Sequence, residues 1–228
     1  MSEPEVLARH RNEVAELVLR RRPGPPPVYE LVVDGVFAMD SAHTETERAL
    51  AELTLARLDG DGPLTVVVGG LGLGHTGRAL LADRRVARVH VVELHAVLAE
   101  WMRAGLLPGA DLLADPRVRL QIADVADAVP ALAPGTVDAV LLDVDNGPGF
   151  LVHQGNARLY QEAFLAAAAR TLRPGGILAI WSADPAPALV GSLSRACGTG
   201  EEVLLPVRRD GREFDHAVYL GRSDHSKP

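Results

Sequence analysis

The stretch VVVGGLGLGHTG, residues 66–77, decides the fold of this 228-residue chain. It joins a short apolar strand, LTVVV (64–68), to a segment with helical character near 76–83. Three glycines alternate in the connecting loop: Gly70, Gly72 and Gly74. Glycines at such a strand-to-helix turn allow a sharp bend and let a ligand approach the backbone closely. The loop therefore points to a nucleotide-binding α/β domain, although a tight turn alone would also explain it.

Strand-like and helix-like segments alternate after this loop. The predicted strands cover 86–93, 117–123, 136–143 and 177–183, and the predicted helices 95–105, 125–132, 157–171 and 185–196. Between the third of these helices and the strand after it, LRPGG (172–176) predicts a helix end followed by a sharp turn. The alternation predicts a mostly parallel sheet with helices on both faces.

The chain closes on two apolar runs, 201–209 and 212–220, that flank Asp210-Gly211. Asp-Gly between two such runs is a strong signal for a β-hairpin. We expect this hairpin to add antiparallel strands to the edge of the sheet.

Residues 1–60 differ in character and are expected to form a cap on a catalytic domain that covers residues 61–228. The segment 28–39, VYELVVDGVFAM, contains a second Asp-Gly turn and predicts a small β-hairpin. Residues 5–22 fit an amphipathic helix, and within them AELVLRRR (15–22) fits a strand equally well. A helix is expected to follow the hairpin, because Thr44 and Glu47 have the spacing of a capping box.

Composition excludes several classes of protein. Acidic residues outnumber basic ones by 30 to 23, which argues against a nucleic-acid-binding surface. The single cysteine, Cys197, excludes an internal disulfide and a Cys-rich zinc site, and no metal site is expected. No apolar run reaches the roughly 18 residues of a membrane span. The polar start MSEPEVLARH does not resemble a signal peptide, so we expect a cytoplasmic protein with no membrane partner.

Two acidic residues stand where successive predicted strands end. Glu93 ends the second strand, 19 residues after Gly74, and an acid at that distance can accept hydrogen bonds from a ribose diol. Asp124 follows the third strand and can accept from an adenine amine. An N-cap for the helix that follows explains Asp124 nearly as well, and the two roles are compatible.

A third polar cluster lies in LLDVDNGPGF, residues 141–150. Asp143, Asp145 and Asn146 follow the fourth predicted strand, at the edge where open α/β sheets bind ligands. A turn built on Asp-Asn-Gly would account for two of the three side chains. We therefore interpret Asp143, Asp145 and Asn146 as candidate catalytic residues.

In their order along the chain, these motifs resemble the class I S-adenosylmethionine-dependent methyltransferases. The finer pattern is similar to their relatives, the spermidine synthases or polyamine aminopropyltransferases. ELVVDGVFAMD (30–40) resembles that family's hairpin, and the aspartate loop before Gly147-Pro148 resembles its DSSDPxGP segment. The resemblance implies a Rossmann-like, mostly parallel seven-stranded sheet, an adenosyl sulfonium cofactor, a small-molecule acceptor and a homodimer.

The resemblance also implies roles for individual residues. The glycine loop passes under the methionine portion of the cofactor, Glu93 holds the ribose and Asp124 the adenine. Asp143 lies closest to the sulfonium, where it orients the cofactor amine or acts as a base. Asp145 and Asn146 bind the polar group of the substrate.

Further side chains are candidates for the acceptor site: Met39, Glu47, His153, Gln154, Tyr160 and Trp181. Phe37 is expected to roof the pocket with Met39 and Glu47, although core packing is the simpler explanation for Phe37. A surface position explains His153 as well as a site does. Trp181 would suit a cationic or aromatic acceptor.

The chain departs from the family at positions that matter for charge. Leu73 falls where the family has an aspartate facing the aminopropyl amine, and Asn146 replaces the second acid of the aspartate loop. Glu47 and Arg48 fall near a Tyr-Gln pair that holds the diamine. Losing acids at such positions favours S-adenosylmethionine and methyl transfer. Aminopropyl transfer from decarboxylated S-adenosylmethionine is the alternative, and an inactive binding or scaffold protein is a second one.

Overall fold

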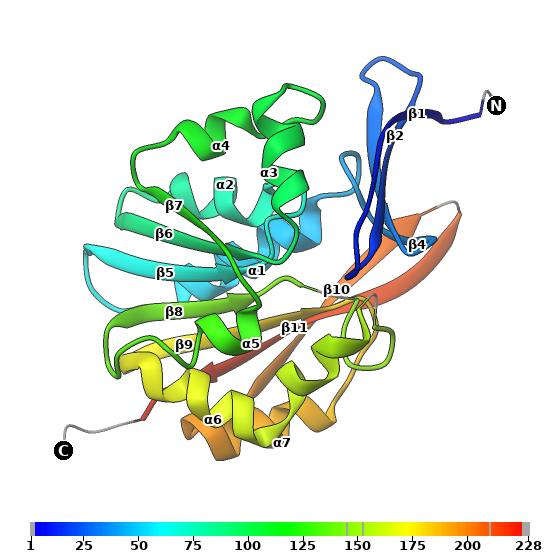
Figure 1. Ribbon diagram of the computed structural model, residues 1–228. Helices are drawn as coiled ribbons and strands as arrows, with labels where there is room; N and C mark the ends of the chain where they lie inside the picture. The colour runs from blue at the N-terminus through cyan, green and yellow to red at the C-terminus, as the bar shows by residue number, and fades with distance from the viewer. Residues whose placement is uncertain (1–2, 145, 152, 210, 225–228) are drawn as a thin grey trace.

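The larger of two sheets confirms the expected architecture. The computed structural model describes residues 3–144, 146–151, 153–209 and 211–224 (Figure 1). In this sheet β5 to β9 run parallel, and the β10–β11 hairpin adds two antiparallel strands beside β9. The order across the sheet is β10-β11-β9-β8-β5-β6-β7. Its strands are β5 (Leu64–Gly69), β6 (Val86–Glu93), β7 (Val118–Ile122), β8 (Val137–Leu142), β9 (Leu172–Ser182), β10 (Glu201–Arg209) and β11 (Arg212–Arg222).

The second sheet holds four antiparallel strands in sequence order. They are β1 (Glu5–Arg11), β2 (Glu16–Arg22), β3 (Val28–Val33) and β4 (Val36–Asp40). The expected hairpin is β3–β4, and its turn places both Asp34 and Gly35 at positive φ. A helix over residues 5–22 is wrong, because β2 pairs with both β1 and β3 and buries Leu17 and Leu19 completely.

Helices cover both faces of the larger sheet, as Figure 1 shows. The helices are α1 (Glu45–Ala56), α2 (His75–Leu81), α3 (Ala96–Arg103), α4 (Ala110–Ala114), α5 (Val125–Ala128), α6 (Glu162–Thr171) and α7 (Ala188–Cys197), with a 3-10 helix η1 (Gln154–Tyr160). Side chains of α1 to α4 join the small sheet in one apolar core, and those of α5 to α7 form a second core. No helix in the described ranges is long and apolar enough to cross a bilayer.

Two local expectations are wrong. Thr44 precedes α1 but its side chain makes no capping hydrogen bond, and Glu47 is buried instead of closing a capping box. The segment 172–176 forms the start of β9 and not a turn outside it. Its extra residues are accommodated by a register shift against β8, with Gly175 at a φ of +78°.

Candidate active site

The loops at the carboxyl ends of the parallel strands enclose a pocket. Gly70 follows β5, Glu93 ends β6, Asp124 follows β7 and Asp143 follows β8. The small sheet covers the pocket with side chains of β3 and β4: Leu31, Val33, Ala38 and Met39. Predicted site residues in the lining are Met39, Glu47, Gly70, Gly72, Glu93, Asp124, Asp143, Asn146, His153 and Trp181. This edge is where open α/β sheets bind their ligands.

Other predicted site residues lie elsewhere. Gly74 is outside the lining, at the start of α2, where an added Cβ would lie 2.9 Å from Cδ2 of Leu112. Tyr160 ends η1 and packs against the second core, and Gln154 begins the same element. Asp145 lies outside the described residues. For Gly74, packing against α4 therefore accounts for the absence of a side chain.

The glycine loop packs tightly against its surroundings. Gly70 and Gly72 have φ values of +95° and +48°. A Cβ on Gly70 would lie 2.1 Å from the carbonyl oxygen of Asp143, and one on Gly72 would lie 2.6 Å from Sδ of Met39. The backbone of these two glycines therefore packs closely against the end of β8 and the covering sheet.

Replacing Gly70 by Ala is expected to lower the free energy of unfolding by about 3 kcal/mol or more. The left-handed backbone alone costs about 1–2 kcal/mol for a residue with a Cβ, and the collision with Asp143 adds to it. Gly35→Ala is the matched control, because Gly35 has a φ of +78° but no atom within 4 Å of its Cβ position. Chemical denaturation measures both losses, and equal losses would show that the contact with Asp143 is unimportant.

Glu93 presents a buried carboxylate to the pocket. Its Oε2 accepts a hydrogen bond from the backbone N–H of Leu71 at 2.8 Å, and its Oε1 accepts from that of His95 at 2.7 Å. Burial raises the pKa of Glu93, while these backbone hydrogen bonds oppose the shift. The carboxylate thus ties the glycine loop to the start of α3 and keeps acceptor capacity toward the pocket.

Asp124 has the N-cap role that the sequence allowed. Its Oδ1 accepts from the backbone N–H of Ala126 at 2.8 Å, at the first turn of α5. Its Oδ2 forms an ion pair with Arg158 of η1. Asp124 also lines the pocket, so the cap and a ligand contact remain compatible.

Thr76 lies between the carboxylate of Asp143 and the backbone of Glu47. Its Oγ1 lies 2.6 Å from Oδ2 of Asp143 and 3.3 Å from the backbone oxygen of Glu47. Thr76 is itself buried at the start of α2. Burial raises the pKa of Asp143 to about 6, although the Thr76 hydrogen bond lowers it in part. A threonine just after a glycine loop was a sequence signal for this contact that the motif analysis passed over.

Glu47 brings a second acid to the same place. The residue is 6% exposed and its Oε2 accepts a hydrogen bond from Oγ1 of Thr46 at 3.0 Å. Burial and the neighbouring charge of Asp143 raise the pKa of Glu47 to about 7. A negative charge on one acid therefore disfavours a negative charge on the other. A bound cation would stabilise both ionised forms.

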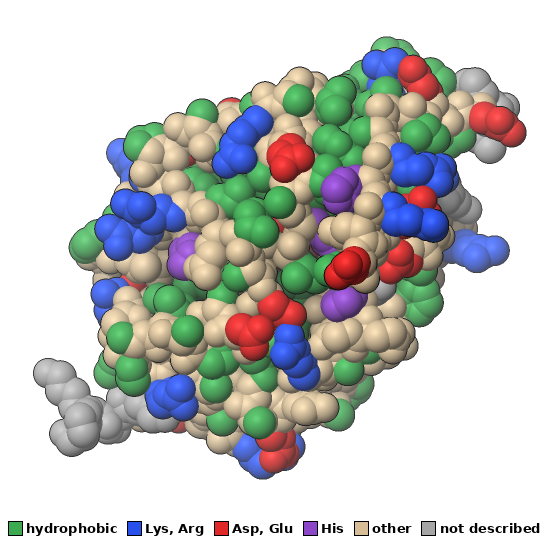
Figure 2. Space-filling model, in the orientation of Figure 1, with side chains coloured by type: hydrophobic (Ala, Val, Ile, Leu, Met, Phe, Trp, Pro, Cys, Tyr) green, Lys and Arg blue, Asp and Glu red, His purple; other side chains and the backbone are tan. Residues whose placement is uncertain are grey.

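The charge of the lining is one-sided. Among the described residues, the pocket is lined by four carboxylates and by no Lys or Arg: Glu47, Glu93, Asp124 and Asp143. His95 and His153 are the titratable nitrogens of this lining. Figure 2 shows histidine side chains gathered beside the small sheet, where it meets the larger sheet. This lining suits a cationic ligand.

Two buried nitrogen atoms of the lining are unsatisfied. Nε1 of Trp181 and Nδ1 of His95 have no hydrogen-bond partner within the described part of the chain. Buried polar groups are normally paired, so these atoms mark places where a ligand with polar groups fits. Together with the bare glycine loop and the carboxylates, they form a site whose chemistry suits a cationic nucleoside such as an adenosyl sulfonium.

A second pocket adjoins the first. Ala38, Met39, Glu47, Asn146 and Trp181 line both. The second pocket extends between β4, the start of α1 and the β10–β11 hairpin, and it adds polar side chains that the sequence analysis did not single out: Asp40, His43, Thr46, Arg209 and His216. The two pockets therefore form one continuous lining that shares five residues.

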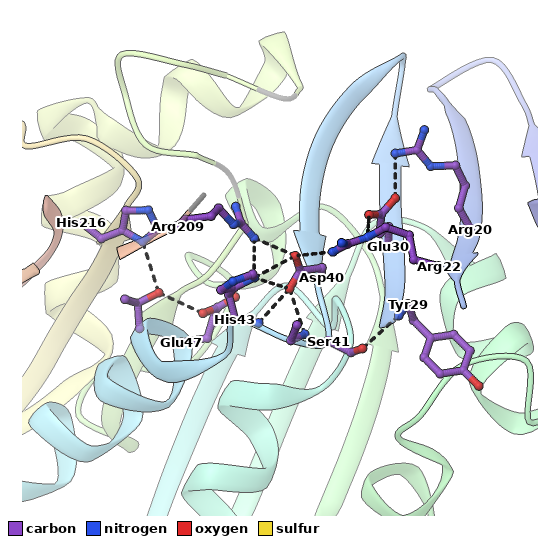
Figure 3. Close-up of polar contacts among 12 residues, drawn as sticks. Arg20, Arg22, Tyr29, Glu30, Asp40, Ser41, His43, Glu47, Arg209 and His216 are labelled. Atoms are coloured by element: carbon purple, nitrogen blue, oxygen red, sulfur yellow. Dashed lines mark hydrogen bonds and ion pairs between the residues drawn. The ribbon is translucent and has the colours of Figure 1, made fainter. Parts of the chain in front are cut away.

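An ion-pair network joins the hairpin to the small sheet across this second pocket (Figure 3). Nη2 of Arg209 lies 2.7 Å from Oδ2 of Asp40 and 3.0 Å from Nδ1 of His43. Burial alone would raise the pKa of Asp40, but hydrogen bonds from His43 and Ala42 and the charge of Arg209 lower it. The Arg209 guanidinium lies 5.1 Å from the ring centroid of Phe37, so Phe37 supports this contact and is not a core residue.

Leu73 does not face the site. Its side chain is completely buried in the first core and does not line the pocket. The position at which the resembled family carries an aspartate is thus a packing position here. The charge of the site depends on Asp143 and Glu47 instead.

Comparisons with known proteins agree with this geometry. No family model matches the chain. It is 29% identical over 187 residues to a polyamine aminopropyltransferase of Mycobacterium tuberculosis, covering 81% of this chain and 34% of the relative. It is 30% identical over 118 residues to putrescine N-methyltransferase 3 of Nicotiana tabacum, covering 51% of this chain and 29% of that protein. The chain thus spans about a third of the length of these curated relatives.

A solved structure is similar over nearly the whole chain. The crystal structure of a spermidine synthase in complex with a transition-state analogue superposes with a TM-score of 0.80 at 17% sequence identity. The match covers 96% of this chain and 73% of that one. The likeness establishes the fold, including the small sheet that precedes the larger one.

Proposed function

We propose that this chain, a spermidine synthase-like protein of the S-adenosylmethionine-dependent methyltransferase superfamily, transfers an aminopropyl group from decarboxylated S-adenosylmethionine to an amine. The observation that carries the proposal is the pair of carboxylates, Asp143 and Glu47, in a lining with no Lys or Arg among its described residues. The sequence relatives are named as an aminopropyltransferase and a putrescine methyltransferase. Both names describe the transfer of an alkyl group.

The charge of the lining discriminates between the two cofactors. Decarboxylated S-adenosylmethionine carries a sulfonium and an ammonium, whereas the full cofactor also carries a carboxylate. A carboxylate needs a cationic partner, and the two neighbouring acids, Asp143 and Glu47, would repel it. The departure at Leu73 favours the full cofactor, but that side chain lies in the core. Glu47, a candidate for the acceptor site, lines the pocket as a second acid beside Asp143.

The chain's own residues divide the work between two pockets. Glu93 and Asp124 stand at the ends of β6 and β7 as acceptors for ribose and adenine. The bound cofactor supplies a carbon activated by the sulfonium. Asp143 holds the cationic amine of the cofactor, oriented by Thr76, and Glu47 removes the proton of the acceptor amine. The acceptor occupies the second pocket, beside Asn146 and Trp181.

Methyl transfer to an amine is the second candidate. The observation in its favour is the matched segment shared with putrescine N-methyltransferase, together with the absence of an acid at Leu73. Both reactions need an unprotonated amine, so Glu47 would have the same part in either.

Product analysis tests the proposal. The chain is incubated with putrescine and each cofactor in turn, and mass spectrometry distinguishes an aminopropylated product from a methylated one. Aminopropyl transfer with the decarboxylated cofactor is the expected result. A methylated product would favour the second candidate, and failure to bind either cofactor would favour a binding or scaffold protein.

Affinity for the decarboxylated cofactor is expected to rise with pH, by about tenfold or more between pH 5 and pH 8. The pKa values of about 6 for Asp143 and about 7 for Glu47 lie within this interval, and a cation binds the ionised forms better. Calorimetry at several pH values measures the change. In Asp143→Asn the dependence should be shallower, and an affinity that falls with pH would contradict the assignment.

A further inference from the structure

We propose that Thr46 and His216 form a proton path that leads from Glu47 into the second pocket. The inference rests on the proposed function, because the proton concerned is the one that an acceptor amine must lose before it can attack. It assigns a purpose to Thr46 and His216, whose side chains come from distant parts of the chain and meet beside Glu47.

The path is continuous (Figure 3). Oγ1 of Thr46 lies 3.0 Å from Oε2 of Glu47 and 3.3 Å from Nδ1 of His216. Glu47 lines both pockets, whereas Thr46 and His216 line only the second among the residues described. Thr46 is 9% exposed and Glu47 is 6% exposed, so direct exchange of the Glu47 proton with solvent is restricted. His216 is half-buried and therefore reaches the more open end of the path.

The ring of His216 is fixed at this position. It makes an edge-on contact with Trp181, with ring centroids 5.0 Å apart, and a tilted contact with Phe214 at 5.4 Å. Burial and the charge of Arg209 lower the pKa of His216, so the ring is neutral near pH 7 and has a nitrogen free to accept a proton.

Charged groups on every side determine where along the path the proton is most stable. Glu47 faces Asp143 at the end of β8 and Asp40 at the end of β4, and both disfavour its ionised form. His216 faces Arg209 of β10, which disfavours a charged ring, and Asp184 after β9, which favours one. The proton is therefore more stable on Glu47 than on His216. The imidazolium is a short-lived carrier that gives its proton to solvent.

The step balances as a proton transfer without any change in oxidation state. An N–H bond of the acceptor ammonium breaks and an O–H bond forms on Glu47, leaving a lone pair on the amine. Glu47 then passes a proton to Oγ1 of Thr46 while the Thr46 hydroxyl gives its own proton to Nδ1 of His216. The imidazolium loses a proton to water, and Glu47 is again ionised.

Thr46→Val tests the path, because valine keeps the shape of threonine and removes the hydroxyl. We expect kcat for transfer to putrescine to fall by about 10- to 100-fold, with KM for the amine within about threefold of wild type. Thr46→Ser should restore most of the rate. Thr54→Val is the matched control, since Thr54 lies in the same helix, is fully buried and donates its hydroxyl hydrogen to the Leu50 carbonyl oxygen. His216→Ala should be slow and regain activity with added imidazole.

A second readout does not depend on turnover. The NMR titration of the His216 ring, assigned with His216→Gln, should show an inflection near pH 7 as Glu47 ionises. The inflection should disappear in Glu47→Gln and become smaller in Thr46→Val, which lacks the hydroxyl that links the two groups. If neither cofactor gives a product but the inflection is present, the proposed function fails and the proton linkage stands. If Thr46→Val is as active as Thr54→Val, or the inflection is absent in the wild type, the path is overturned.

Discussion

Replacing Asp143 by Asn is expected to lower kcat by about a thousandfold or more. Asn keeps the shape of the side chain and can accept the hydrogen bond from Thr76, but it cannot neutralise a cation. Groups that position charge at a reacting centre are worth about two to four decades in rate. Steady-state kinetics with the decarboxylated cofactor and putrescine measure the loss.

Stability separates this effect from misfolding. The pKa of Asp143 is raised in the fold from 3.8 to about 6, so its ionisation opposes folding as the pH rises through this range. Asp143→Asn removes the unfavourable free energy of ionising this buried group. The Tm of the variant at pH 8 should therefore equal or exceed that of the wild type. Asp127→Asn is a control at an exposed site near Asp124. A folded Asn variant with wild-type kcat would contradict the role given to Asp143.

Replacing Glu47 by Gln is expected to remove most of the preference for the decarboxylated cofactor. The carboxylate lines the shared wall of both pockets, next to the charge of Asp143. We expect the ratio of the two affinities to fall by about tenfold or more, which is about 1.4 kcal/mol. Amine transfer should fall as well, because the variant has no base at the end of the Thr46 path.

The matched control for this variant is Glu52→Gln. Glu52 lies in the same helix, is mostly exposed and forms an ion pair with Arg48 at 3.7 Å. Its replacement should leave both affinities within about twofold of wild type, since exposed ion pairs contribute little. An unchanged cofactor ratio in Glu47→Gln would mean that discrimination arises elsewhere in the lining.

The sequence predicts the features of the fold that depend on local residue pattern and on the direction of the strands. Parallel strands end at one edge, so the acids that follow three of them were expected to meet there, and Glu93, Asp124 and Asp143 do line one pocket. Asp-Gly turns predicted both hairpins correctly, because each turn is specified by its own residues. Segment 5–22 remained ambiguous because the pairing that makes it two strands depends on β3.

The acceptor side of the site depends on contacts between distant segments. Arg209 contacts Asp40, and His216 contacts Thr46, although the partners are about 170 residues apart in the chain. A local sequence pattern does not predict such pairs. Leu73 shows the opposite failure. Position alone suggested a side chain in the site, but that side chain turns into the core, where its apolar volume is needed.

Binding of the two cofactors to the wild-type chain shows directly whether the acids of the pocket select the decarboxylated form. Calorimetry at pH 8, where Asp143 and Glu47 are ionised, compares decarboxylated S-adenosylmethionine with the full cofactor. We expect the decarboxylated form to bind more tightly by about tenfold or more. Equal or tighter binding of the full cofactor would contradict it.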